Sequence, residues 1–204
     1  MNITNKSTLI ILDWDDTLFP TSWITKNNIE IQSIKNSPNI AYFTKIDLAL
    51  YKLLKLMLKC GDIYIITNAL LNWIVISSSI LPKTCDLLKS SQIKIISARG
   101  EYQAKYDNPM DWKKIAFQKE LNSIMKNKLI NNIISIGDAE YEYNALINLY
   151  RDDEKNYKLL KSVKFIRYPN NYQLLDQILV LTNAIVDICM KTKHLDLKFN
   201  QISD

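Results

Sequence analysis

The chain has 204 residues, of which 48% are hydrophobic and 23% charged, a balance typical of folded globular proteins and not of disordered ones. A single domain of this length buries about seven-tenths of its unfolded surface, so it needs no disulfide or structural metal to fold. The formal net charge of +5 comes mainly from scattered lysines, which does not favour nucleic acid as the main partner. We attribute the abundance of Ile, Asn and Lys to an AT-rich genome.

The sequence favours a soluble, cytoplasmic protein. The first eight residues are polar, and no uninterrupted apolar run approaches the roughly 18 residues that span a bilayer, so we expect neither secretion nor membrane binding. Cys60, Cys85 and Cys189 lie far apart and are expected to be reduced thiols. The single histidine, His194, lies near the polar C-terminal end, which leaves catalysis to carboxylates, hydroxyls and lysines.

Short apolar runs rich in β-branched residues alternate with longer amphipathic stretches along the chain. This alternation predicts an α/β fold, a three-layer Rossmann-like parallel sheet with helices on both faces. We expect about five strands, at residues 8–13, 62–67, 93–97, 133–137 and 163–167. We expect helices at residues 46–59, 70–81, 111–126, 138–148 and 171–191.

One domain is expected over residues 1–204. Residues 20–44 are rich in Asn, Ser and Thr with weak periodicity, which predicts a short flap or minimal cap insert and not a second domain. The final residues, 192–204, are expected to form a loosely held tail.

Polar side chains follow several of the expected strands at the point where each strand ends. The first strand ends in Asp13 and Asp15, the second in Thr67 and Asn68, and the fourth in Asp138. Because right-handed crossovers bring the carboxyl ends of parallel strands to one edge, we expect these side chains to converge. Paired carboxylates suit Mg²⁺, whereas a hydroxyl and an amide suit an anion such as phosphate.

Two further residues near these strand ends have alternative interpretations. Arg99 directly follows the third strand, where it could bind a substrate phosphate or carboxylate, or form a salt bridge at the rim. Asp16 is expected to accept hydrogen bonds from amides of the turn after the first strand. The aromatic residues beside the motifs are expected to belong to the core.

Taken together, Asp13-x-Asp15-x-Thr17, then Ile66-Thr67-Asn68, a lysine at a helix start and Gly137-Asp138 resemble the haloacid dehalogenase-like superfamily, in a small-cap or capless form. The resemblance implies the strand order 3-2-1-4-5 and a Mg²⁺-dependent phosphatase. It makes Asp13 the nucleophile that becomes an aspartyl-phosphate and also a metal ligand. It makes Asp15 the general acid and base, with its backbone carbonyl on the metal. Thr67 would hold the phosphoryl group, with Asn68 beside it, and Asp138 would bind the metal.

The lysine of the third motif has three candidates, Lys105, Lys113 and Lys114. Pro109 to Lys113 is typical of a helix start, with Asp111 as a candidate cap, so we select Lys113. Its role would be to neutralise the phosphate and the nucleophile. The alternative is that these lysines only solvate a helix face.

The last motif differs from the family pattern at its second acidic position. The family often has Asp four residues after the first acidic residue, whereas this chain has Glu142. Glu is longer and can reach a metal through water, so we expect Glu142 to belong to the metal site. Glu140 is the solvent-facing alternative.

The short insert after the first motif predicts an open site. An open site favours a phosphate on a macromolecule, such as a phosphoprotein. A polynucleotide end phosphatase is the alternative activity. A catalytically silent scaffold that binds a partner or a phosphorylated ligand is the alternative without turnover. A carboxylate at Asp15 favours phosphatase chemistry, because dehalogenase branches of the superfamily lack one there.

Overall fold

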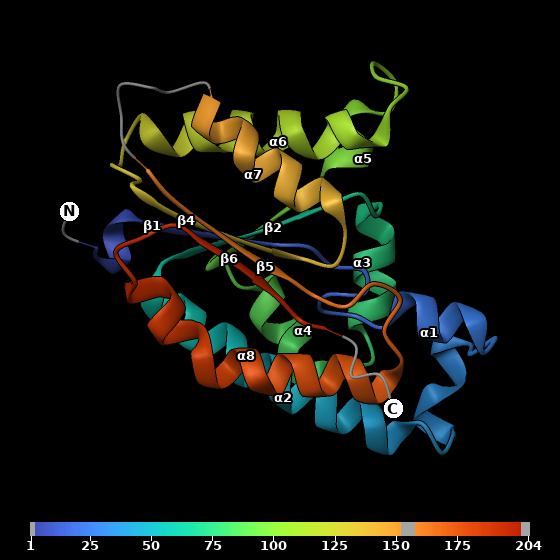
Figure 1. The fold of residues 1–204 in the computed structure, drawn as a ribbon. Coiled ribbons are helices and arrows are strands. Elements are labelled where there is room, and N and C mark those ends of the chain that lie inside the picture. The colour runs from blue at the N-terminus through green and yellow to red at the C-terminus, as the bar shows by residue number, and fades with distance from the viewer. Residues whose placement is uncertain (1–2, 152–157, 201–204) are drawn as a thin grey trace.

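Six parallel strands form the central sheet of the computed structural model, which describes residues 3–151 and 158–200 (Figure 1). Their order is β3-β2-β1-β4-β5-β6, so the expected order of the first five strands is confirmed and one strand is added at the edge. The strands are β1 (Thr8–Leu12), β2 (Asp62–Thr67), β3 (Ile93–Ser97), β4 (Asn132–Gly137), β5 (Leu159–Lys164) and β6 (Leu195–Lys198).

Helices cover both faces of this sheet. In Figure 1, α2, α4 and α8 lie on one face, while α5, α6 and α7 lie on the other. The α-helices are α1 (Thr21–Lys26), α2 (Ile40–Cys60), α3 (Leu71–Ser78), α4 (Pro82–Lys89), α5 (Ala98–Tyr102), α6 (Pro109–Met125), α7 (Glu140–Arg151) and α8 (Asn171–Met190). Two 3-10 helices, η1 (Asn5–Ser7) and η2 (Ile31–Asn36), complete the described elements.

A separate hydrophobic core fills each of the two layers. Phe43 and Leu50 of α2 pack with Ile178 and Ile185 of α8 beneath one face of the sheet. Phe117 of α6 belongs to the core of the other face. The continuously buried pattern of β1 and β4 follows from this double cover, because strands covered on both faces have no solvent side.

Helix α8 is the one helix of the described residues that is long and apolar enough, by length and composition, to cross a membrane. Its buried side chains, which include Leu174, Ile178, Leu181 and Ile185, pack into the core beside α2. The helix thus has the contacts of a core helix, and its expected extent, residues 171–191, is confirmed to within one residue.

The register of the strands places their carboxyl ends together. Leu12 of β1 pairs with Ile65 of β2 and with Ile136 of β4, and Thr67 of β2 pairs with Ser97 of β3. The residues that follow these strands therefore leave the sheet at one edge, which is the edge where the sequence predicts the site.

The fifth strand begins earlier than expected. The prediction of residues 163–167 is wrong, because β5 covers Leu159–Lys164. Lys161 interrupts the apolar run in the sequence, yet it is fully buried, and its Nζ donates to the carbonyl oxygens of Ile188 and Cys189, both at 2.8 Å. These carbonyls lie at the end of α8 and have no partner within the helix, so Lys161 satisfies them.

The expectation of a loose tail over residues 192–204 is also wrong where the structure describes it. Leu195–Lys198 form β6, which pairs in parallel with β5. The ring of Phe199 packs edge-on against Phe165, with centroids 5.1 Å apart. Residues 201–204 lie outside the described part of the chain. A short strand with one polar face at the sheet edge leaves little apolar signal in the sequence.

The helices after the first two strands differ from expectation in extent. Residues 20–44 contain α1, η2 and the start of α2, which begins at Ile40 and not at residue 46. The aromatic rings of Trp23, Tyr42 and Phe43 pack together in this segment. The single helix expected at residues 70–81 is shorter and is followed by α4, whose first position is Pro82.

Candidate active site

The loop after β1 is a tight turn that fixes three aspartates in different directions. The backbone amide of Asp13 still donates to the carbonyl of Ile136 at 2.9 Å, so this residue continues the pairing with β4. Asp16 adopts a positive φ of 54°, and its carboxylate accepts hydrogen bonds from the backbone amide (2.8 Å) and hydroxyl of Ser22. Asp16 is therefore structural, as the sequence indicated, although its partners lie in α1.

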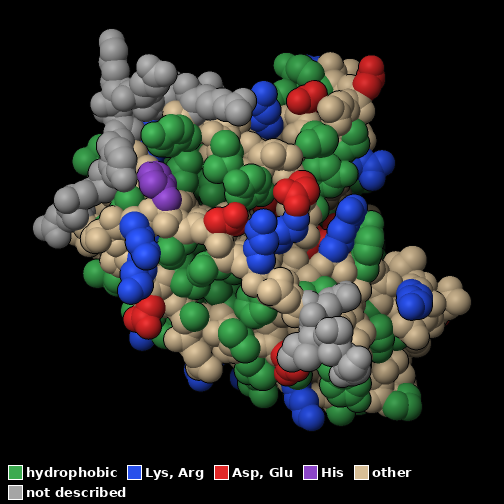
Figure 2. Space-filling model, in the orientation of Figure 1, with side chains coloured by type: hydrophobic (Ala, Val, Ile, Leu, Met, Phe, Trp, Pro, Cys, Tyr) green, Lys and Arg blue, Asp and Glu red, His purple; other side chains and the backbone are tan. Residues whose placement is uncertain are grey.

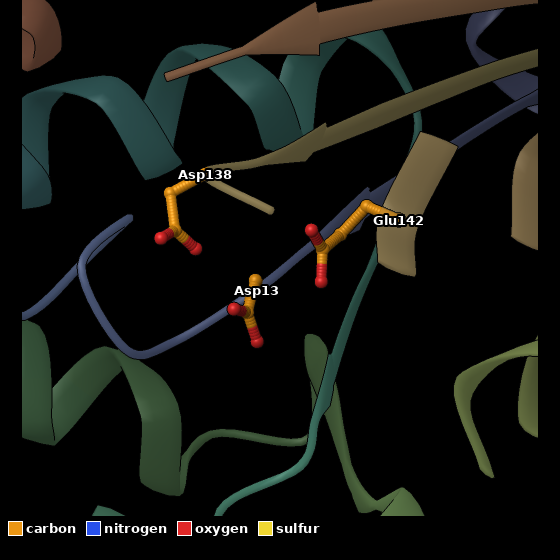
Figure 3. Close-up of side chains that lie close together, drawn as sticks. All are labelled: Asp13, Asp138 and Glu142. Carbon is orange, nitrogen blue, oxygen red and sulfur yellow. The ribbon is translucent and has the colours of Figure 1, made fainter. Parts of the chain in front are cut away.

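Three carboxylates meet at the carboxyl edge of the sheet. Asp13 follows β1, Asp138 follows β4 and Glu142 lies in the first turn of α7, and Figure 3 shows the three side chains pointing toward one another. One carboxylate oxygen from each lies within 4.8 Å of the others, and all three residues are buried. Such a group is repulsive unless protons or cations offset its charge.

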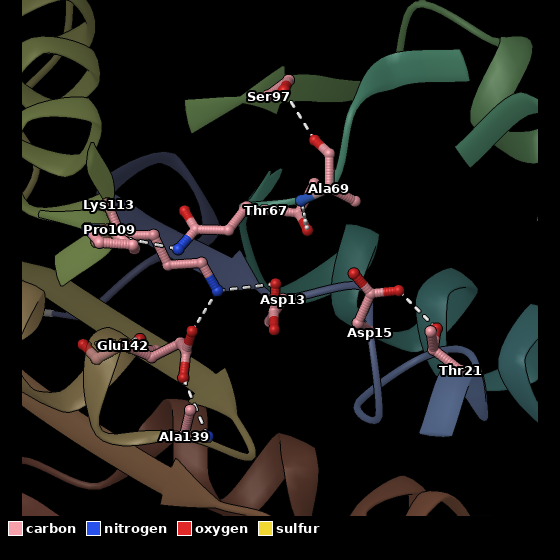
Figure 4. Close-up of polar contacts among 12 residues, drawn as sticks. Asp13, Asp15, Thr21, Thr67, Ala69, Ser97, Pro109, Lys113, Ala139 and Glu142 are labelled. Carbon is pink, nitrogen blue, oxygen red and sulfur yellow. Dashed lines mark hydrogen bonds and ion pairs between the residues drawn. The ribbon is translucent and has the colours of Figure 1, made fainter. Parts of the chain in front are cut away.

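Lys113 provides one positive charge to this group. It lies in the first turns of α6 with 2% of its surface exposed, and its Nζ is 2.7 Å from Oδ1 of Asp13 and bonded to Oε1 of Glu142 (Figure 4). Burial alone would lower the pKa of Lys113, but the attraction of Asp13 and Glu142 outweighs burial and raises that pKa. Lys113 therefore stays protonated and bridges the two carboxylates.

The structure thus distinguishes among the three lysine candidates by position. Lys105 and Lys114 are exposed, whereas Lys113 contacts the carboxylates. The helix start differs in one detail, because Asn108 and not Asp111 caps α6, with its Oδ1 accepting the amide hydrogen of Met110 at 3.1 Å.

Glu142 occupies its position because the residue at the end of β4 has no side chain. A Cβ built on Gly137 would lie 2.3 Å from Cγ and 2.6 Å from Oε2 of Glu142, so any larger residue would displace this carboxylate. Oε2 of Glu142 also accepts the backbone amide hydrogen of Ala139 at 3.1 Å. Glu140, in contrast, forms an ion pair with Lys164, and its side chain is 61% exposed.

The charge of the group matches a divalent cation. Burial, and then the negative charges of Asp13 and Glu142, raise the pKa of Asp138 to about 8. When all three carboxylates are ionised, three negative charges less the one of Lys113 leave two. These three buried carboxylates could therefore hold a metal cation through oxygen ligands.

Asp15 lies beside this group with its own partners. Its Oδ1 accepts a hydrogen bond from Nε1 of Trp73 at 2.8 Å and another from the hydroxyl of Thr21. Burial raises the pKa of Asp15 and the charge of Asp13 adds to this effect, while the bonds from Thr21 and Trp73 oppose it. Trp73 is far from Asp15 along the chain, so no local signal in the sequence indicates this contact.

The loop after β2 is held by its own polar side chains. Oγ1 of Thr67, which is buried, accepts the amide hydrogen of Ala69 at 3.0 Å, and its own hydroxyl hydrogen has no acceptor among the described residues. Nδ2 of Asn68 donates to the carbonyl of Pro109 at 3.3 Å, which ties this loop to the start of α6 (Figure 4). Ser97 donates to the carbonyl of Ala69 at 2.6 Å.

Charged side chains gather on the face of the molecule that Figure 2 shows, where acidic and basic groups lie close together near its centre.

Arg99 lies in α5, where it is exposed and its Nε donates to Oε1 of Gln103 at 2.9 Å. This contact is within one helix and involves neither of the two partners considered for Arg99 from the sequence. A role in binding substrate stays a prediction.

No family model, curated protein or solved structure matches this chain. A function is therefore inferred from the site itself and from the order of its motifs.

Proposed function

We propose that this chain is a Mg²⁺-dependent phosphatase of the haloacid dehalogenase-like type, which hydrolyses phosphoric monoesters through an aspartyl-phosphate on Asp13. The observation that carries this proposal is the buried contact of Lys113 with both Asp13 and Glu142, within the carboxylate group that includes Asp138. These residues come from motifs spread over most of the chain, and a structural ion pair alone gives no reason for a third buried carboxylate beside them.

The metal would be held by the carboxylates of Asp13 and Asp138 and by the backbone carbonyl of Asp15, with Glu142 acting through water. When bound, Mg²⁺ would neutralise negative charge on the phosphate and the nucleophile. The buried carboxylates fit this role because burial, and then their mutual repulsion, raises the pKa of Asp138, and a cation would offset both effects.

The residues of the site have different roles in the two chemical steps, which are formation and hydrolysis of the aspartyl-phosphate. A carboxylate oxygen of Asp13 attacks phosphorus, the bond from phosphorus to the leaving oxygen breaks, and Asp15 gives that oxygen a proton. Water then attacks the phosphorus of the aspartyl-phosphate, Asp15 takes a proton from it, and phosphate leaves with Asp13 restored. Lys113 offsets charge on Asp13 throughout, and the hydroxyl of Thr67 donates to the phosphoryl oxygens.

The substrate is proposed to be a macromolecular phosphate, with a phosphoprotein favoured over a polynucleotide end. The insert between β1 and α2 is short and forms only α1 and η2, which supports an open site. A cap large enough to enclose a small metabolite would need a longer insertion.

The test is release of phosphate from an aryl phosphate, with Mg²⁺ and with a chelator. We expect Mg²⁺-dependent release that Asp13→Asn abolishes. Asp62→Asn is the matched control, because Asp62 begins β2 at the opposite edge of the sheet and pairs there with Lys128. Phosphopeptides, end-phosphorylated oligonucleotides and nucleotides then rank the substrates. Binding of a phosphorylated ligand without hydrolysis of any of these would instead favour the silent scaffold.

A further inference from the structure

We propose that Trp73 is a positioning residue for Asp15, and that it holds the carboxyl group so that Oδ2 is the oxygen that exchanges a proton with the substrate. This inference rests on the proposed function of Asp15 as proton donor and acceptor. It assigns a role to a residue of α3 that belongs to none of the motifs in the sequence.

The two hydrogen bonds that the structure gives to the side chain of Asp15 go to the same oxygen. Nε1 of Trp73 donates to Oδ1 at 2.8 Å, and the hydroxyl of Thr21 donates to Oδ1 as well. Figure 4 shows the other oxygen pointing away from Thr21, on the side where Asp13 and Thr67 lie. Oδ2 is thus the oxygen that faces the proposed nucleophile.

The chemistry of the indole group favours one oxygen of Asp15 as the carrier of the proton. An indole N–H can only donate, and the carbonyl oxygen of a protonated carboxyl group is a better acceptor than its hydroxyl oxygen. A hydroxyl such as that of Thr21 can donate or accept, and alone it would permit a proton on either oxygen. Because both donors occupy Oδ1, Trp73 leaves Oδ2 as the favoured oxygen for proton exchange.

Phe19 links the two partners of this contact. The ring of Trp73 packs edge-on against Phe19, with centroids 5.9 Å apart and an interplanar angle of 85°. Phe19 is fully buried and is bridged through its backbone to Asp15 itself. The indole therefore packs on a residue whose backbone is bridged to that of Asp15, which keeps α3 beside the loop after β1.

The inference is tested with Trp73→Phe, which removes the N–H and keeps an aromatic ring. Proton donation matters most when the leaving oxygen is strongly basic. A comparison of rates on alkyl and aryl phosphates therefore distinguishes a loss of proton donation from a general disturbance of the site. We expect kcat to fall roughly tenfold or more on an alkyl phosphate and much less on an aryl phosphate with an acidic phenol, with KM little changed.

Three further variants separate positioning from stability. Trp23→Phe alters another aromatic ring of the same core, which packs on Tyr42 and Phe43. This variant should keep the wild-type ratio of kcat on the alkyl phosphate to kcat on the aryl phosphate. Thr21→Ser keeps a hydroxyl that can donate to Oδ1 of Asp15, so the ratio of alkyl to aryl kcat should stay the same. Thr21→Val removes this hydroxyl and should change the ratio in the same direction as Trp73→Phe.

An equal loss on both substrates in Trp73→Phe, or no loss, would overturn the role of Trp73 while the wild-type activity stands. Absence of any activity in the wild-type protein is a separate result, which rejects the proposed function and this inference with it.

Discussion

Replacing Lys113 by methionine tests the electrostatics of the site in the absence of any metal. Methionine keeps most of the apolar volume but removes the ammonium group that bridges Asp13 and Glu142. Because Lys113 is 2% exposed and both carboxylates are buried, water cannot replace the lost charge. Removing one partner of such a buried pair costs about 3–5 kcal/mol, so we expect the free energy of unfolding to fall by about that amount.

A second substitution shows whether the loss comes from unpaired charge. Glu142→Gln removes one of the carboxylates that Lys113 neutralises, so Lys113→Met should cost less in that background. For residues in direct contact, the difference between the two costs should be about 0.5–3 kcal/mol. The double variant should therefore be more stable than the sum of the two single losses predicts.

Urea unfolding at neutral pH, with a chelator present, measures the free energy of unfolding of the wild-type protein, the two single variants and the double variant. Lys114→Met is the matched control, because Lys114 is the next residue of α6 and is exposed, and we expect a change within about 0.5 kcal/mol. A cost below about 1 kcal/mol for Lys113→Met, or the same cost with and without Glu142→Gln, would refute the role of Lys113 in neutralising the two carboxylates.

Two further substitutions test the packing around the site and the core behind it. Gly137→Ala places a Cβ 2.3 Å from Cγ of Glu142. We expect Mg²⁺ binding, measured by calorimetry, to weaken, and the free energy of unfolding in urea to fall by about 1–3 kcal/mol. Unchanged values for both would contradict this prediction. Burial lowers the pKa of Lys161 from 10.5 to about 8, so between those pH values the unfolded chain binds more protons and stability rises with pH. The free energy of unfolding of the wild-type protein, relative to that of Lys161→Met, should therefore rise by roughly 1 kcal/mol per pH unit over this range and should not change below pH 8. A difference that stays constant with pH would show that Lys161 does not titrate in this range.

The sequence is sufficient to predict the arrangement of the first five strands and the edge where the site lies. Apolar runs of strand length are a strong signal when both faces are buried, as in β1 and β4. Parallel topology then brings the residues after those strands together, which is why Asp13, Thr67 and Asp138 can be grouped from the sequence. The choice of Lys113 rests instead on the family resemblance and on the helix start at Pro109.

The failures of prediction have a different cause, because they depend on tertiary contacts. Lys161 is polar in the sequence but buried against the end of α8, which hides the start of β5. The edge strand β6 has mostly exposed residues and is stabilised by its pairing with β5. The contact between Trp73 and Asp15 joins α3 to the loop after β1, and no local pattern indicates it.

The central claim is that Asp13 carries the phosphoryl group during the reaction. Rapid acid quenching of the protein with a labelled phosphoric monoester and Mg²⁺, followed by peptide mapping, tests this claim most directly. We predict label on the peptide that contains Asp13 in the wild-type protein, released by hydroxylamine as an acyl phosphate is, and no label in Asp13→Asn. Turnover of the substrate without label on that peptide, or with equal rates in Asp13→Asn, would contradict the claim.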